Sequence, residues 1–310
     1  MKKISIVKLF VFLLVVVVSM TTVLGQKKKR PAVAKPTPPA KVKSVIFAVV
    51  NDGASLEPIG YIENGKLTEA ATGMSDGKII ETFNKTYYQP KATYNLIFGG
   101  NLDGKAAVVK SNAAAECAKN MADVTSQATK AKLKGFVMAL ATNAPMTKAG
   151  SGVRRKPTFA EKAEIDRLAQ AEFTKQKAAL TGFNYHNLTA IDVDNDGKVE
   201  FVGTYWVEPN PKERGLLFFI AEKNSSGKYV LTHSDYKLTK ESDVMNSEIK
   251  ALDEGIYHEL LLDVFDVDGD GVSEIFTIDK GFEANGFNVY HRESGKWTKT
   301  FEVSNYHCGY

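Results

Sequence analysis

The sequence predicts a mainly β protein, a β-rich α+β fold, and three observations support this prediction. Short runs of β-branched and aromatic residues, separated by Gly, Asn and Asp turns, fill most of residues 44–143 and 183–310. A nine-residue pattern rich in Asp occurs twice in the second of these regions. A helical pattern with a capping signal stands out at residues 158–178. We therefore expect a small N-terminal β-rich domain at 44–143, a linker at 144–157, one connecting amphipathic helix, and two antiparallel β units at 183–310.

Residues 1–25 have the layout of a secretory signal peptide. Two lysines precede an apolar run from Leu9 to Val18, and Gly25 is a small residue suited to the cleavage position. The run is short for a membrane span. We therefore expect export with removal of residues 1–25, giving a secreted, periplasmic or cell-surface protein. The alternative is an uncleaved membrane anchor, because the positive charges of Lys27–Arg30 follow directly and normally stay on the cytoplasmic side.

Residues 26–43 are basic and rich in proline, with seven positive charges, no acidic residue and four prolines. Such a composition cannot bury a core, so we expect a disordered linker. Its charge could also bring it into peripheral contact with an anionic envelope surface. The full chain has a net charge of +4 and residues 1–43 carry +10, so residues 44–310 carry −6. We therefore expect no nucleic-acid partner for the folded part.

The N-terminal region, residues 44–143, contains several apolar runs that end at Gly- or Asn-containing turns. The expected strands are Ser44–Val50, Ile59–Ile62, Lys78–Phe83, Tyr94–Phe98, Ala106–Lys110 and Gly135–Ala141. Ser111 is a candidate cap for a short helix over residues 112–116. Asn101–Lys105 is expected to be a hairpin turn rather than a metal loop, because it has one carboxylate. We recognise no catalytic motif in this region.

A single amphipathic helix is expected after Thr158. Thr158 and Glu161 have the spacing of a capping box, and Ile165, Leu168, Ala169 and Phe173 follow along one face. Helices of this kind usually pack on a sheet. We expect this helix to lie over the open side of the two β units and to cover an exposed edge.

The two Asp-rich segments both read D-x-D-x-D-G-x-x-E. Carboxylates at alternate positions can converge on one hard cation, and the glycine permits the tight turn around it. We expect one Ca²⁺ in each loop, with the backbone carbonyls of Lys198 and Val272 as further ligands. The predicted side-chain ligands are Asp192, Asp194, Asp196 and Glu200 in the first loop and Asp266, Asp268, Asp270 and Glu274 in the second. The alternative is a turn that satisfies only its own backbone.

The segments around these loops argue against an EF-hand. Position twelve, where an EF-hand has a bidentate Glu, is Gly203 in the first loop and Thr277 in the second. Apolar, β-branched runs flank both loops, so each loop is expected to join two strands. We also expect the aromatic residues of this region to be buried. They are Tyr205, Trp206, Phe218, Phe276, Tyr290 and Trp297.

A second shared signal follows each loop. Ser226-Gly227-Lys228 precedes Tyr229, and Ser294-Gly295-Lys296 precedes Trp297, so each unit has a second hairpin turn before an aromatic residue. With the D-x-D-x-D-G-x-x-E loops, residues 183–310 resemble the FG-GAP or VCBS-type repeat of integrin-alpha-like propellers. The resemblance implies two propeller-blade-like units of four strands, and a role in adhesion, carbohydrate binding or scaffolding. Two units are too few for a closed propeller.

The remaining chemistry-bearing residues leave two functions open. Cys117 and Cys308 could form a disulfide in an exported protein or remain free and buried. None of the five histidines has zinc-ligand spacing, and no nucleophile motif is present. We therefore favour an exported calcium-binding, non-enzymatic binding or scaffold protein with a protein or glycan ligand. The alternative is a secreted, polysaccharide-active hydrolase with structural calcium, which requires a pocket with two carboxyl groups about 5–9.5 Å apart.

Overall fold

The computed structural model describes residues 42–146 and 150–308. The predicted signal peptide and all but the last two residues of the basic linker lie outside these residues. The mainly β prediction is confirmed, since the described chain consists largely of antiparallel strands. The described residues form one compact unit. No helix in the described part of the chain combines the length and the apolar character needed to cross a membrane.

The first region is a small barrel with a helix against it. Its sheet has the strand order β1-β7-β4-β5-β6-β2-β3, and because β1 also pairs with β2, six of the strands form a closed ring. We call this ring, with β3 and α1 (Gly77–Tyr87), the N-terminal barrel. The strands are β1 (Ser44–Val50), β2 (Ser55–Glu63), β3 (Lys66–Glu69), β4 (Thr93–Phe98), β5 (Asn101–Ser111), β6 (Ala122–Ala128) and β7 (Ala139–Thr142).

The second region contains two antiparallel meanders of four strands each. The first meander is β9 (Asn184–Ile191), β10 (Glu200–Asn210), β11 (Glu213–Lys223) and β12 (Tyr229–Lys240), with the short β8 (Arg154–Arg155) paired to the edge of β9. The second meander is β13 (Glu259–Phe265), β14 (Glu274–Lys280), β15 (Ala284–Glu293) and β16 (Lys296–Tyr306). Two 3₁₀ turns, Glu241–Asp243 and Ile249–Glu254, connect the meanders.

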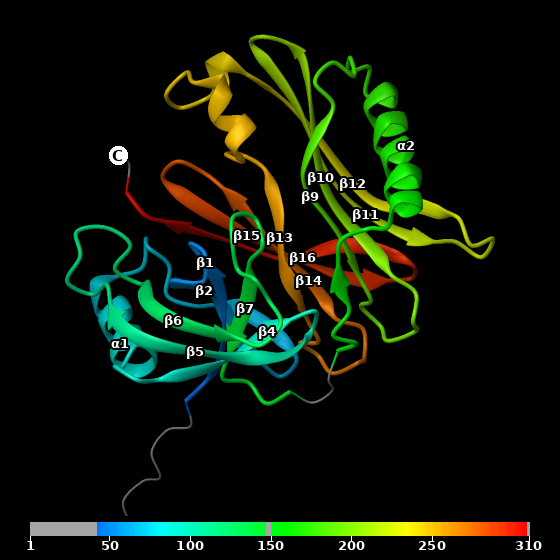
Figure 1. Cartoon of the computed structure of the whole chain (residues 1–310). Helices are drawn as coiled ribbons and strands as arrows, with labels where there is room; N and C mark the ends of the chain where they lie inside the picture. The colour runs from blue at the N-terminus through cyan, green and yellow to red at the C-terminus, as the bar shows by residue number, and fades with distance from the viewer. Residues whose placement is uncertain (1–41, 147–149, 309–310) are drawn as a thin grey trace, which may run out of the picture. The chain divides into compact units, whose positions relative to one another are not determined.

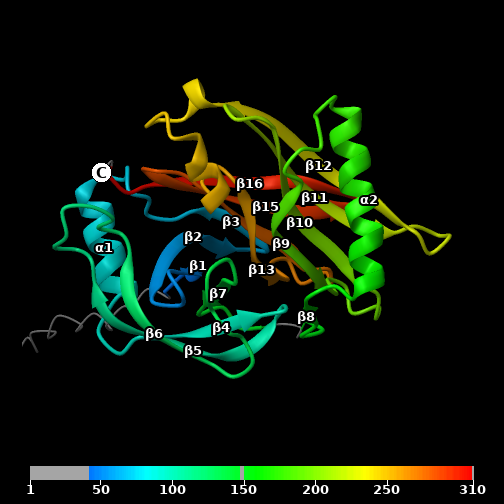
Figure 2. The ribbon, with the colours of Figure 1, turned by 45° about the horizontal axis from the view of Figure 1, so that its top comes forward.

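These parts stack in layers, as Figures 1 and 2 show: α2 (Phe159–Lys175), the first meander, the second meander and the N-terminal barrel. The layers stack because successive side chains of a strand point to opposite faces, so one strand can pack against the layers on both sides. In β13, Leu260 and Leu262 pack with the barrel, whereas Leu261 and Val264 pack with the first meander. A strand buried on both faces needs a mostly apolar sequence, which explains Leu260–Leu262, Val264 and Phe265. Asp263, the charged residue within this segment, is paired with Arg154.

The N-terminal barrel and the second meander share a hydrophobic core across the predicted domain boundary. Ile46 and Ala48 of β1 lie in the same buried cluster as Phe276 and Ile278 of β14. The barrel and the second meander therefore stabilise each other in the folded chain. Whether residues 44–143 and 183–310 fold independently stays a prediction, as does the likeness of the meanders to propeller blades.

The predicted helix is confirmed. Thr158 accepts a hydrogen bond from the Glu161 N–H, and the Glu161 carboxylate accepts one from the Thr158 N–H, which completes the capping box. Ile165, Ala169 and Phe173 are fully buried against the first meander. The prediction that the helix covers a sheet edge is wrong: it packs on a face of the first meander, and β8 pairs with the edge of β9.

Several local predictions in the barrel are wrong. The predicted strand at Lys78–Phe83 is part of α1, because Ile80, Phe83 and Tyr87 are buried at helical spacing and Asp76 caps the helix. The predicted short helix after Ser111 is absent from the described residues 112–121, where turns connect β5 to β6.

The predicted turn at Asn101–Lys105 is also misplaced. These residues begin β5, and the turn is made by Gly99 and Gly100, which both have positive φ. Asp103 is buried and accepts hydrogen bonds from the N–H groups of Lys130 and Ala131. The predicted strand at Gly135–Ala141 is shorter, beginning at Ala139.

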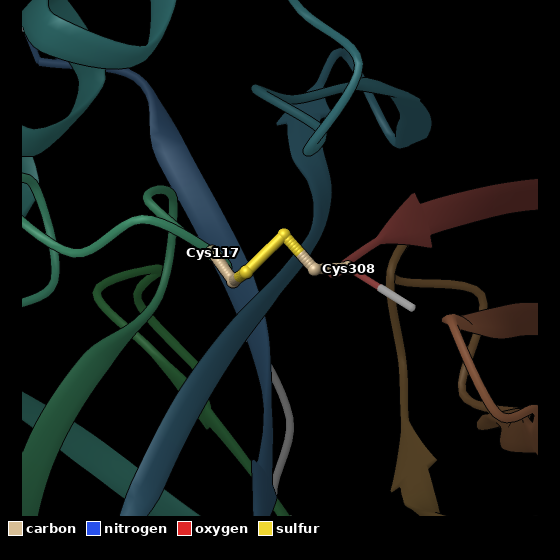
Figure 3. Close-up of a disulfide and its surroundings, with 2 residues drawn as sticks. All are labelled: Cys117 and Cys308. Atoms are coloured by element: carbon tan, nitrogen blue, oxygen red, sulfur yellow. A yellow bond between two sulfur atoms is a disulfide. The ribbon is translucent and has the colours of Figure 1, made fainter. Parts of the chain in front are cut away.

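Of the two alternatives for the cysteines, the structure contains the disulfide. Cys117 and Cys308 are joined with an S–S distance of 2.08 Å and a Cα–Cα distance of 5.4 Å. As Figure 3 shows, the bridge attaches the C-terminal end of the chain to the segment between β5 and β6 of the barrel.

Candidate metal centre

The first Asp-rich loop joins β9 to β10, as expected, and its carboxylates organise its own backbone. The N–H of Asp196 donates to Asp194 Oδ1 at 3.2 Å, and the N–H of Gly197 donates to Asp192 Oδ2 at 3.3 Å. The Lys198 N–H donates to Asp196 Oδ1 at 2.7 Å. Gly197 has a φ of +79°, a conformation that favours glycine at this turn. The loop is thus held with its acidic side chains turned inward.

Three carboxylates converge in this loop. Asp192, Asp194 and Asp196 each offer one oxygen, and these oxygens lie within 4.8 Å of one another. Asp192 is only 5% exposed, and its Oδ1 has no hydrogen-bond partner among the described residues. A buried carboxylate oxygen without a donor is costly. A cation bound among the three side chains would remove that cost.

Glu200, the last residue of the pattern, accepts a hydrogen bond from the loop backbone and does not converge with the three aspartates. Its Oε2 accepts a hydrogen bond of 3.0 Å from the Val193 N–H. Burial raises the pKa of Glu200 to about 8, with smaller contributions from the nearby carboxylates of Asp194, Glu222 and Asp192. Glu200 is not among the three convergent carboxylates, so its role as a ligand stays a prediction, as does that of the Lys198 carbonyl.

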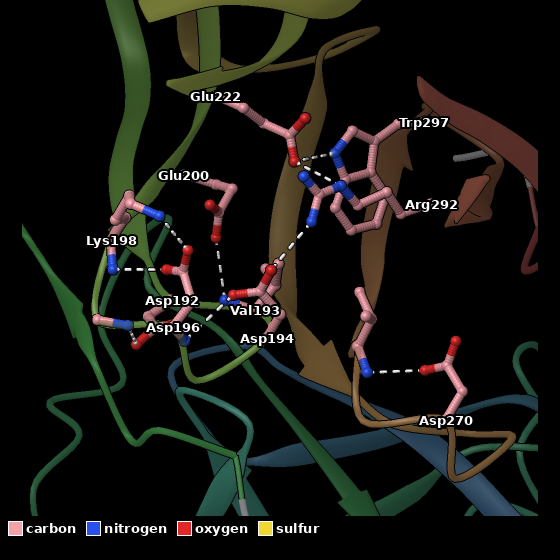
Figure 4. A network of polar contacts seen from close by, with 12 residues as sticks. Asp192, Val193, Asp194, Asp196, Lys198, Glu200, Glu222, Asp270, Arg292 and Trp297 are labelled. Carbon is pink, nitrogen blue, oxygen red and sulfur yellow. Dashed lines mark hydrogen bonds and ion pairs between the residues drawn. The ribbon is translucent and has the colours of Figure 1, made fainter. Parts of the chain in front are cut away.

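A cation from the second meander already contacts this loop. Arg292 of β15 donates to Asp194 Oδ2 at 2.9 Å and lies 3.0 Å from Glu222 Oε1 (Figure 4). The indole N–H of Trp297 donates to the same Glu222 oxygen at 3.2 Å. Lys198 forms a further ion pair with Asp196. Arg292 could not be predicted from local pattern, since it lies 98 residues from Asp194 in the chain.

The second loop, between β13 and β14, repeats the backbone pattern of the first. The Val267 N–H donates to Glu274 Oε2 at 2.8 Å, as Val193 does to Glu200. Three further bonds have counterparts at the same positions: Asp270 N–H to Asp268, Gly271 N–H to Asp266, and Val272 N–H to Asp270. The sequence repeat is therefore also a repeat of loop geometry.

The convergent side chains of the second loop differ from those of the first. Asp268, Asp270 and His291 each offer one ligand atom, all within 4.8 Å of one another. Asp266 is not in this group, and its two oxygens accept hydrogen bonds from the N–H groups of Gly269 and Gly271. His291 Nδ1 lies 3.1 Å from Glu274 Oε1, and this contact raises the pKa of His291. The Val272 carbonyl and the carboxylates of Asp266 and Glu274 stay predicted ligands.

Neighbouring residues on β15 serve the two loops. His291 contacts Glu274 of the second loop, whereas Arg292 contacts Asp194 of the first. Successive side chains of a strand point to opposite faces, so one strand can reach both. The loops also touch directly, since the Ser273 N–H donates to the Val193 carbonyl at 2.8 Å. The two candidate sites are therefore connected through β15 and this backbone bond.

Comparisons with known proteins do not identify the chain: no protein-family model, no curated protein and no solved structure matches it.

Proposed function

We propose that this chain is an exported, calcium-binding, non-enzymatic binding or scaffold protein, built on FG-GAP/VCBS-like repeats, in which Ca²⁺ stabilises the two Asp-rich loops. The observation that supports this most directly concerns Asp192 Oδ1, a buried carboxylate oxygen beside Asp194 and Asp196. It has no hydrogen-bond partner in the part of the chain that the structure describes. In this proposal the fold presents a surface or pocket to a protein or glycan ligand. The basic linker contacts an anionic envelope surface.

Ca²⁺ suits the first loop better than the second. Calcium prefers six to eight oxygen ligands in flexible geometry, and the convergent groups of the first loop are all carboxylates. The imidazole of His291 is a softer ligand that favours transition metals. We therefore expect tighter calcium binding at the first loop, and weaker binding of Mg²⁺, whose octahedral shell is less adaptable.

Thermal unfolding with Ca²⁺, Mg²⁺ or chelator tests the proposal. A single site saturated at one hundred times its dissociation constant stabilises the fold by about 2.7 kcal/mol. Asp192→Asn should reduce this gain, because it removes the negative charge with little change of shape. Asp123→Asn, an exposed position on β6, is the matched control and should leave the gain unchanged. An equal melting temperature in all three conditions would exclude calcium as a structural ligand.

The hydrolase alternative is less well supported by the carboxyl groups outside the loops. A pocket of about 530 Å³ is lined by Asp52 and Glu57. Both oxygens of Glu57 accept hydrogen bonds, however, and Asp52 Oδ1 accepts one from the Gly135 N–H. Glu57 is therefore not free to act as a general acid. Release of reducing ends from soluble polysaccharides, abolished by Glu57→Gln, would instead favour the hydrolase.

A further inference from the structure

The pocket of about 530 Å³ lies where the N-terminal barrel meets the second meander. Residues of β1 and β2 form one side of it, and Ile278 and Lys280 of β14 form another. Its volume falls within the range of about 300–1,000 Å³ that is typical of small-molecule sites. None of the residues of the two Asp-rich loops lines it.

A hydrogen-bonded cluster fixes the polar part of this pocket. The Glu57 side chain is fully buried, and its Oε1 accepts hydrogen bonds of 2.7 Å from both Asn305 Nδ2 and His307 Nε2. Its Oε2 accepts one of 2.9 Å from Asn285 Nδ2. Because Glu57 occupies His307 Nε2, the nitrogen left for another partner is Nδ1. The cluster therefore holds the imidazole in place rather than leaving it to rotate.

Two other polar side chains of the pocket have no partner among the described residues. The Lys280 ammonium forms no ion pair with a described residue, and the Asn112 side chain makes no hydrogen bond in residues 42–146 and 150–308. Both side chains are only partly exposed. Such groups gain most from a ligand, because water serves them less completely in a recess than at an open surface.

The pocket is lined by two acidic and two basic residues, and its remaining wall is apolar. Asp52 and Glu57 are acidic, whereas Lys280 and His307 are basic. Burial alone lowers the pKa of His307, but its hydrogen bond to Glu57 and the Glu57 charge outweigh this and raise it. The apolar lining comes from Val50, Met121, Phe136, Met138 and Ile278.

We infer that this pocket binds a neutral saccharide. A sugar ring has hydroxyl groups that both donate and accept, and C–H faces that pack on apolar side chains, which matches the two kinds of wall. A lining that contains acidic and basic residues in equal number favours neither an acidic nor a basic ligand. The inference names a ligand class for the binding function proposed above. Because the pocket shares no residue with the calcium loops, calcium stabilisation and saccharide binding can fail separately.

Calorimetric titration of the full mature chain, in Ca²⁺ and in chelator, tests this inference. The probes are cellotriose, maltotriose, xylotriose, mannotriose and chitotriose, with trigalacturonate as the acidic comparison. We expect at least one neutral trisaccharide to bind and trigalacturonate not to bind. NMR of methionine methyl groups locates the site: Met121 and Met138 should shift, and the exposed Met245 should not.

Two substitutions test whether the pocket binds a ligand or is only a recess in the fold. Lys280→Met and Asn112→Ala should each weaken binding about tenfold, with unchanged melting temperature, since neither side chain has a partner among the described residues. Lys110→Met, an exposed lysine on β5, is the control and should bind as the wild type does. Failure of all the neutral probes, binding of trigalacturonate alone, or methyl shifts that omit Met121 and Met138 would each overturn the inference.

Discussion

The guanidinium of Arg154 lies 3.1 Å from Asp263 Oδ2, and the two side chains are 5% and 0% exposed. Arg154 also donates to the carbonyls of Met138 and Leu262, at 2.9 and 2.6 Å. Asp263 accepts a hydrogen bond of 2.9 Å from the Gly99 N–H. This one ion pair therefore joins the segment before α2, the β4–β5 turn of the barrel and strand β13.

Arg154→Met should destabilise the fold by about 3–5 kcal/mol, because it leaves the Asp263 carboxylate buried without its counter-charge. Urea unfolding at neutral pH measures the change. Lys85→Met is the control, since Lys85 and Glu81 form an ion pair that is largely exposed, and no measurable change is expected there. An Arg154→Met variant within about 1 kcal/mol of the wild type would show that the carboxylate is compensated in another way.

Arg292→Met should increase the stabilisation that calcium provides by about 1 kcal/mol. Arg292 supplies positive charge to Asp194 and Glu222, so its loss should weaken the calcium-free protein and leave the first loop more dependent on a bound cation. The difference in melting temperature with and without Ca²⁺ measures this effect. Lys85→Met removes an exposed ion pair with Glu81 on α1 and should leave the calcium effect unchanged. An equal calcium effect in wild type and Arg292→Met would mean that the arginine and the cation do not compete.

Features encoded within about ten residues could be predicted from the sequence. The Thr158 capping box, the two strand–loop–strand hairpins and the burial of Tyr205, Tyr290 and Trp297 are all confirmed. Each depends on a local pattern, such as the period of a helix or a glycine at a fixed place in a turn. The inward arrangement of the loop carboxylates follows from the same local rules.

Features that depend on distant residues could not be predicted. Ile79, Ile80 and Phe83 are good strand formers, yet Lys78–Phe83 is helical, because the barrel buries one helical face of this segment. His291 and Arg292 reach the loops from another strand, and nothing in the nine-residue pattern indicates them. Closure of the barrel depends on the pairing of β1 with both β2 and β7, which no local signal specifies.

The buried His258 should make stability depend on pH. Its two ring nitrogens have no partner in the described part of the chain, and its ring centroid lies 4.4 Å from that of His186. Burial, with a smaller effect from His186, lowers the pKa of His258 to about 3. Between pH 6.5 and 3 the unfolded chain thus binds a proton that the folded chain does not. The unfolding free energy should fall by about 1.4 kcal/mol per pH unit from this group as pH decreases.

His258→Phe should remove this contribution. Urea unfolding between about pH 4.5 and 7 gives the unfolding free energy as a function of pH. This dependence should be shallower for the variant than for the wild type, by the equivalent of about one proton. Tyr257→Phe changes the neighbouring residue without removing an imidazole, and its slope should match the wild type. Equal slopes for His258→Phe and wild type would show that the folded protein accommodates a charged His258.

The Cys117–Cys308 disulfide should contribute strongly to stability through the unfolded state. It joins residues 191 positions apart, and a loop of this length loses much conformational freedom when it is closed, worth about 5 kcal/mol at most in the chain-entropy model. Ala118 and His307, which are the chain neighbours of the two cysteines, both line the pocket of about 530 Å³. The bridge therefore holds two walls of this pocket together. A Cys117→Ser, Cys308→Ser double variant should therefore unfold at lower urea concentration and bind the pocket's ligand more weakly.

Reductant should destabilise the wild type and leave the double variant unchanged, which controls for effects of the reagent elsewhere. A wild type that is equally stable in oxidised and reduced form, with full reduction confirmed by thiol titration, would show that the packing of residues 305–308 on the barrel is sufficient without the bridge.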